Sequence, residues 1–203
     1  MLDNIIALIA TWIMSVISSM GYGGIMMLMA IESACIPLPS EVIMPFAGFL
    51  VSKGEMSLLG IALAGAFGCV LGSIPTYFVG MYGGRPLAER YGKYVLISKK
   101  DLDWADNAFA KHGQLIIFIG RLLPAVRTFI AFPAGVARMN MTKFVSYTFI
   151  GSFIWCWMLG YAGIKMGEHW EELKVYFHEF HYVIIGAAVI FVIWYLRRHF
   201  KVD

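Results

Sequence analysis

The sequence predicts an all-α integral membrane protein built as an inverted repeat. We expect two opposed re-entrant helical hairpins, each followed by a transmembrane helix, and further membrane helices at both ends of the chain. Three observations support this fold class. The 203 residues are 60% hydrophobic and only 14% charged, unlike soluble domains. Long uncharged runs alternate with short apolar pieces that contain proline, and the two halves of the chain share similar stretches.

Four uncharged runs are candidates for helices in the membrane: Ile5–Ile31, Met56–Gly84, Phe144–Ile164 and Tyr182–Leu196. The middle two are long enough to cross a hydrocarbon core about 30 Å thick. The first run contains "GYGG" at Gly21–Gly24, which predicts a break within it. No basic region precedes this run, so we expect it to be retained rather than cleaved as a signal peptide.

Two shorter apolar segments cannot span the membrane as ordinary helices. Val42–Ser52 contains Pro45 and Thr128–Ala137 contains Pro133, and both are well below the roughly 20 residues that a spanning helix needs. Irregular backbone at membrane depth is tolerated only where it is packed in protein or lines a wet cavity. These segments therefore predict two re-entrant hairpins. The predicted helix breaks are at Pro37, Pro39, Pro124 and Pro133.

The whole chain, residues 1–203, is predicted to form one membrane domain. Its parts are a first repeat at 25–84, a cytoplasmic interfacial connector at 85–113, a second repeat at 114–167 and a C-terminal helix at 180–203. In the connector, Ser98 and Asp101 form a variant of the capping box, and Gly113 fits a helix C-cap. A solvated connector that only joins the two halves is the alternative.

The distribution of lysine and arginine predicts the orientation. Residues 83–113, 138–143 and 197–203 together hold most of the 16 lysines and arginines, whereas the other side receives only Lys53, Lys165 and Lys174. The positive side of a membrane protein faces the cytoplasm, so we expect a cytoplasmic C-terminus. The first hairpin then enters the membrane from outside and the second from inside.

The two hairpins also resemble one another in sequence. "PSEVIMPFAG" in the first half matches "PAVRTFIAFPAG" in the second, and Ala47-Gly48 and Ala134-Gly135 are as far apart as Gly80 and Gly167. Together with the opposite direction of entry, this match indicates an inverted repeat. Transporters of that architecture form a site at the membrane midplane from broken helices.

Four ionisable residues flank the predicted breaks. Glu32 and Glu41 lie in "ESACIPLPSE", and Arg121 and Arg127 lie in "GRLLPAVRTF". An ionisable group at the membrane centre costs about 2.5–3.5 kcal/mol on insertion scales, so four of them predict a functional site. Two alternatives stay open: ion pairs that only lock the hairpins together, and side chains that lie at the membrane interface rather than at depth.

With these motifs and a glycine-rich span in each half, the sequence resembles the DedA membrane proteins over roughly residues 20–170. The resemblance implies two opposed re-entrant hairpins and transport of undecaprenyl phosphate, the cell-wall lipid carrier, back across the bacterial cytoplasmic membrane. It also implies that the acids Glu32 and Glu41 and the bases Arg121 and Arg127 are needed for activity. The expected partners are a polyprenyl phosphate lipid, other membrane lipids and protons, with no nucleic acid, metal or cofactor, and the sequence is compatible with a homo-oligomer.

The chemistry of these residues suits a phosphate. Arginine is permanently charged and can bind phosphate oxygens through two parallel hydrogen bonds, so we expect Arg121 and Arg127 to bind the head group. Helix N-termini near Pro124 and Pro133 can add backbone donors. We expect Glu32 and Glu41 to pair with the arginines and to take up protons when phosphate displaces them, which would couple transport to the proton gradient.

Three other functions remain open. They are a non-selective phospholipid scramblase, a proton-coupled antiporter for small ions or drugs, and an intramembrane lipid phosphatase with Ser40 as nucleophile. All five histidines fall at segment ends, away from the hairpins, so we expect a transporter rather than an enzyme. Cys35, Cys69 and Cys156 are interpreted as buried thiols without a function, and Trp155 as a residue facing lipid or protein.

Overall fold

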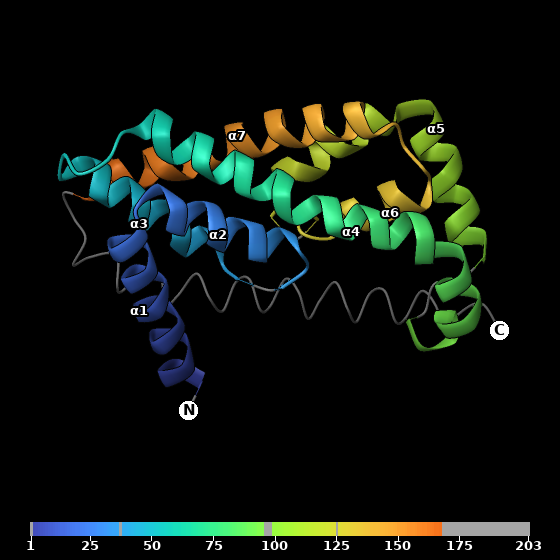
Figure 1. Ribbon diagram of the computed structural model, residues 1–203, viewed down its shortest axis with the longest axis horizontal. Coiled ribbons are helices and arrows are strands. Elements are labelled where there is room, and N and C mark those ends of the chain that lie inside the picture. The colour runs from blue at the N-terminus through green and yellow to red at the C-terminus, as the bar shows by residue number, and fades with distance from the viewer. Residues whose placement is uncertain (1, 37, 96–98, 125, 168–203) are drawn as a thin grey trace. The chain divides into compact units, whose positions relative to one another are not determined.

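The described residues form seven helices in this computed structural model, which describes residues 2–36, 38–95, 99–124 and 126–167 (Figure 1). In chain order they are α1 (Leu2–Met20), α2 (Tyr22–Ser33), α3 (Ser40–Ser52), α4 (Leu58–Val95), α5 (Lys99–Leu122), α6 (Ala131–Val136) and α7 (Met141–Met166). Two stretches are long and apolar enough to cross a membrane, Leu58–Gly83 in α4 and Met141–Met166 in α7. This confirms the two predicted middle spans. The predicted C-terminal helix at 180–203 lies outside the described residues.

The predicted break in the first uncharged run is also confirmed. Gly21 separates α1 from α2 and has a φ of 57°, in the left-handed region that glycine adopts without steric cost. Ahead of it, α1 runs through most of the first apolar segment. The glycine therefore turns one long apolar run into two helices with different directions (Figure 1).

Two further breaks separate α2 from α3 and α5 from α6. After α2, Cys35 takes a left-handed φ of 65°, and Pro39 then caps α3 with extended backbone. After α5, residues 123–124 and 126–130 form turns and a bend whose backbone is hydrogen-bonded locally, as between the Arg127 amide and the Leu123 carbonyl at 3.1 Å. Local pairing of this kind satisfies the polar backbone where the helix is interrupted. Pro37 lies outside the described residues.

The connector between the halves is helical at both of its ends. α4 continues to Val95 and α5 begins at Lys99, so the predicted cap residue Ser98 lies outside the described residues. Within α5, His112 has non-helical backbone angles (φ −134°, ψ 22°), which place a kink next to Gly113. The predicted helix end at Gly113 is therefore a kink, after which α5 continues to Leu122.

α4 packs against one short helix from each half of the chain. An added Cβ on Gly72 would overlap the Ala30 carbonyl oxygen of α2, and one on Gly135 of α6 would overlap the Tyr77 carbonyl oxygen of α4. Figure 1 shows α2 and α6 lying along α4. Only small residues allow backbones to approach so closely, as is typical of helices packed in a membrane.

α7 packs against α3 and α5, again at glycines. An added Cβ on Gly48 of α3 would overlap the Gly160 carbonyl oxygen, and one on Gly151 would lie 2.8 Å from the Cβ of Arg121 on α5. α4 and α7 therefore each pack against one helix from their own half of the chain and one from the other half.

Replacing Gly135 with alanine should destabilise the protein, because the new methyl group meets backbone that cannot move aside. Overpacking of this kind costs about 1–3 kcal/mol. In a chain of this size we expect the Tm of the detergent-purified protein to fall by about 5 °C. Gly23→Ala is the matched control, because no atom lies within 4 Å of its added Cβ. Equal Tm values for the two variants would contradict the packing described here.

Candidate anion-binding site

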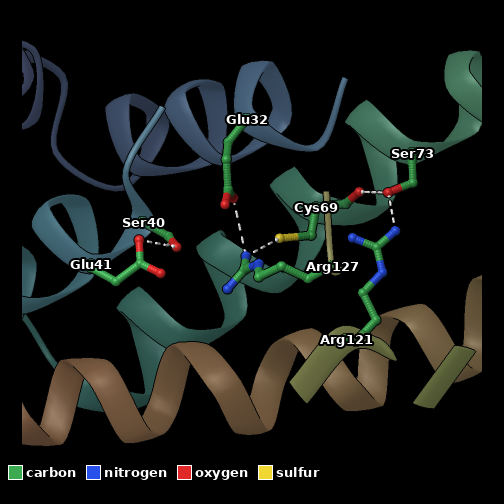
Figure 2. A network of polar contacts seen from close by, with 7 residues as sticks. All are labelled: Glu32, Ser40, Glu41, Cys69, Ser73, Arg121 and Arg127. Carbon is green, nitrogen blue, oxygen red and sulfur yellow. Dashed lines mark hydrogen bonds and ion pairs between the residues drawn. The ribbon is translucent and has the colours of Figure 1, made fainter. Parts of the chain in front are cut away.

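Arg127 lies in the break after α5, at the centre of a buried polar cluster. Its side chain is 1% exposed, and Nη2 donates to Glu32 Oε2 at 3.1 Å and to Cys69 Sγ at 3.4 Å. Figure 2 shows these two partners reaching the guanidinium from α2 and α4. Glu32 is itself buried, at 4% exposure. The predicted facing of an acid from the first half and an arginine from the second is therefore present for Glu32 and Arg127.

Arg121 is equally buried but has a neutral partner. It lies in the last turn of α5, and its Nη2 donates to Ser73 Oγ at 2.5 Å, while Ser73 Oγ donates to the Cys69 carbonyl oxygen at 2.5 Å (Figure 2). Among the described residues no ion pair joins Arg121 to a carboxylate. α4 thus holds both arginines, one through Cys69 and one through Ser73.

Glu41 is not joined to either arginine. It lies in the first turn of α3 and accepts a hydrogen bond from the neighbouring hydroxyl, Ser40 Oγ to Glu41 Oε2 at 3.2 Å. Within the described part of the chain, the ion pair of Arg127 is with Glu32 alone. The structure brings together one of the two expected acid–base pairs, and it places the second acid beside a serine (Figure 2).

The two breaks themselves are in contact. Cys35 Sγ, in the break after α2, donates to the Thr128 carbonyl oxygen in the break after α5 at 3.5 Å. Pro39 precedes α3 and Pro124 follows α5, so both lie in these breaks, whereas Pro133 lies in the first turn of α6. The interrupted backbone of both halves therefore surrounds one site.

Both arginines keep buried donors that have no partner among the described residues. Eight buried polar atoms have no hydrogen-bond partner among the described residues: Ser33 Oγ, Nε and Nη1 of Arg121, Nε and Nη1 of Arg127, Thr148 Oγ1, Ser152 Oγ and Trp155 Nε1. Guanidinium and indole nitrogens can only donate, and hydroxyls can donate. Each buried donor left unpaired costs about 1–3 kcal/mol. A ligand rich in acceptor oxygens, such as an oxyanion, would satisfy the unpaired nitrogens of the two arginines.

Several residues of the site were not predicted from the sequence. Cys69 was interpreted as a buried thiol without a function, yet it contacts Arg127, and the ring of Trp155 lies 5.2 Å from the Arg127 Cζ. Cys156 is buried as expected, whereas Cys35 is half-buried. Their spacing in the sequence could have predicted a polar helix face, because residues at i, i+4 and i+7 lie on the same face of a helix. Such polar faces in apolar helices are Cys69, Ser73 and Thr76 in α4, and Thr148, Ser152 and Trp155 in α7.

The fold and the site together define an all-helical membrane protein with a buried, donor-rich arginine site. Residues 38–165 match the VTT domain, and the chain belongs to this family, the DedA family of membrane proteins. The resemblance inferred from the two charged motifs is thereby confirmed.

Three relatives show how far the similarity extends. The chain is 40% identical over 196 residues to the uncharacterized membrane protein YkoX of Bacillus subtilis, covering 96% of this chain and 86% of the relative. It is 37% identical over 173 residues to undecaprenyl phosphate transporter A of Bacillus subtilis, covering 85% and 83%. It is 33% identical over 187 residues to an alkaline phosphatase-like protein of Lactococcus lactis, covering 89% and 87%. No solved structure gives a significant match.

Proposed function

We propose that this protein transports undecaprenyl phosphate across the bacterial cytoplasmic membrane towards the inner leaflet, coupled to protons. The observation that carries the proposal is that Arg121 and Arg127 are both buried and that four of their guanidinium nitrogens have no partner among the described residues. A relative named undecaprenyl phosphate transporter A, similar over most of both chains, supports the choice of lipid.

The donor-rich cluster suits a phosphate monoester better than a zwitterionic head group. A monoester presents three terminal oxygens that accept hydrogen bonds, and the planar fork of arginine can bind two of them in parallel. A choline or ethanolamine group would instead bring a positive charge towards two buried cations, Arg121 and Arg127. We therefore assign phosphate binding to these arginines and expect discrimination against zwitterionic lipids.

We assign proton coupling to the acids of the first hairpin. Phosphate at Arg127 competes with Glu32 for the same guanidinium, to which Glu32 is bonded at 3.1 Å. A displaced carboxylate that is buried and unpaired is costly as an anion, so it takes up a proton. Glu41, hydrogen-bonded to Ser40, is the second acid of the proposal. One proton would then be bound each time the phosphate enters the site.

We further propose that the chain is an inverted repeat with two re-entrant hairpins. The repeats are residues 25–84 and 114–167, and the connector at 85–113 and the C-terminus are cytoplasmic. The glycine contacts support this division, because α4 packs closely against α2 and α6 while α7 packs closely against α3 and α5. Gly48 and Gly135, which correspond in the sequence match of the hairpins, both lie against the long helix of the other half.

Reconstitution into liposomes tests the proposal. We expect the purified protein to flip undecaprenyl phosphate at least tenfold faster than phosphatidylcholine, with a rate that changes when a pH step is imposed across the membrane. Liposomes without protein give the background rate for both lipids. Equal rates for the two lipids would instead establish a non-selective scramblase.

Hydrolysis is the second candidate function. A relative named alkaline phosphatase-like protein and the 3.2 Å contact between Ser40 Oγ and Glu41 Oε2 favour it, because a carboxylate beside a hydroxyl can act as its general base. The same liposomes, loaded with undecaprenyl pyrophosphate, are assayed for released phosphate with the parent and with Ser40→Ala. Release that depends on Ser40 would make the protein an enzyme.

A further inference from the structure

A second group of basic side chains lines a cavity apart from the arginine cluster. The cavity has a volume of about 510 Å³ and lies where the kink of α5 meets the connection between α6 and α7. Its lining includes Lys111, His112, Arg138 and Lys143, and it includes no aspartate or glutamate. Among the described residues no ion pair compensates these side chains. The cavity therefore presents an excess of positive charge.

Two backbone features also favour anion binding at this cavity: the N-terminus of α7 and the unusual backbone of Arg138. α7 begins at Met141, beside the cavity, and Asn140 Oδ1 caps it by accepting from the Lys143 amide at 3.2 Å. The N-terminus of a helix attracts anions, because its amide groups and the helix dipole carry partial positive charge. Arg138 has a left-handed φ of 48°, which is unfavourable for a non-glycine residue and recurs where a side chain is positioned for function.

Part of the remaining wall of the cavity is apolar. Phe109, Leu115 and Met139 line it, and Leu115 is 53% exposed. A free inorganic anion gains nothing from such walls, whereas an amphiphile buries its chain against them. We infer that this cavity is a second binding site, for a phosphate head group that carries an apolar chain. The inference rests on the proposed function and extends it to a site separate from Arg121 and Arg127.

The cavity and the arginine cluster are joined by the same two helices. Gln114 of α5 lines the cavity, and the Tyr147 hydroxyl of α7 donates to Gln114 Oε1 at 3.0 Å. Further along the pair, Gly151 of α7 contacts Arg121 of α5. At 1.5 Å per residue, Arg121 is about 10 Å along α5 from Gln114. The second site is therefore placed to receive a head group released from the arginines, or to deliver one to them.

Binding stoichiometry tests the inference directly. Native mass spectrometry of the full-length protein is carried out with farnesyl phosphate, a short-chain prenyl phosphate, and in parallel with inorganic phosphate. We expect the parent to bind two farnesyl phosphates per chain. The double variant Arg138→Asn/Lys143→Gln should bind one, with at least a tenfold loss of affinity at the second site. Asparagine is chosen because it tolerates the left-handed backbone at position 138.

Single substitutions control for charge and for folding. Lys143→Gln alone, at an exposed side chain, should weaken the second site, whereas Lys53→Gln removes the same charge outside the cavity and should leave both bound molecules in place. Two farnesyl phosphates bound with parental affinity by a folded double variant would overturn the inference. Inorganic phosphate binding to the cavity as tightly as farnesyl phosphate would overturn its assignment to a lipid.

The outcome separates this inference from the proposed function. Loss of one farnesyl phosphate in the double variant supports the second site even if the parent fails to flip undecaprenyl phosphate in liposomes. If the parent flips undecaprenyl phosphate selectively but the double variant still binds two farnesyl phosphates, the proposed transport function is supported and the second site is refuted.

Discussion

Arg127→Lys should lower the transport of undecaprenyl phosphate by at least tenfold, although the positive charge is retained. Lysine cannot bond to Glu32 and Cys69 from one nitrogen and also offer two further nitrogens in the same plane, as the Arg127 fork does. A hydrogen bond to a charged group contributes about 1.5–3 kcal/mol, and about 1.4 kcal/mol corresponds to a tenfold change. The measurement is the initial rate of flip in liposomes at equal protein content.

Arg127→Gln provides the comparison that separates binding from folding. It removes the charge and leaves Glu32 buried without its ion-pair partner, and breaking a buried pair costs about 3–5 kcal/mol. We therefore expect a lower Tm for Arg127→Gln, and a Tm closer to that of the parent for Arg127→Lys. Parental transport by Arg127→Lys would show that the guanidinium fork is not needed and would remove the main support for phosphate binding there.

Glu32→Gln should remove the dependence of phosphate binding on pH and slow transport at least tenfold. The amide oxygen can still accept a hydrogen bond from Arg127, but it can neither compete as an anion nor take up a proton. Under the proposed coupling, Glu32 gives up its proton when it pairs with Arg127 and takes up a proton when phosphate displaces it, so binding takes up a proton. Affinity for farnesyl phosphate should then rise as the pH falls, by up to about tenfold per pH unit.

The affinity is measured between pH 7 and 9, above the second ionisation of a phosphate monoester near pH 6, so that the ligand stays a dianion. We expect a sloping profile for the parent and a flat one for Glu32→Gln. Glu41→Gln is measured in the same series to test the second acid. If its affinity changes with pH as steeply as that of the parent, Glu41 has no role in proton coupling. A parental slope in Glu32→Gln would contradict the assignment of the coupling proton to that residue.

Much of the fold could be predicted from the sequence because membrane helices have a strong length and composition signal. The spans in α4 and α7 and the break at Gly21 followed from uncharged runs and from one glycine cluster. The kink at His112 did not, because the charged pattern ahead of Gly113 also fits a helix that simply ends. The short helix α6 begins later than the apolar segment, since residues up to 130 pair their backbone in turns instead.

Less of the site could be predicted, because its uncharged residues, Cys69 and Ser73, do not stand out in an apolar sequence as charged residues do. Glu32, Arg121 and Arg127 could be predicted because charged residues are rare in an apolar sequence. Ser73 and Cys69 lie 48 and 58 positions from the arginines they contact, in a run that reads as uniformly apolar. The partner of Arg121 was expected to be an acid and is a serine, since a hydroxyl fixes a guanidinium without burying a second charge.

Because helices of the first half pack against helices of the second at these glycines, the order of synthesis matters for folding. The N-terminal half is made first, yet α3 packs against α7 at Gly48, and α4 packs against α6 through Tyr77 and Gly135. When α3 and α4 enter the bilayer, these backbone surfaces have only lipid to cover them until the later helices arrive. A nascent chain that stalls after α4 would therefore leave Gly48 and the backbone at Tyr77 without the helices that cover them in the folded protein.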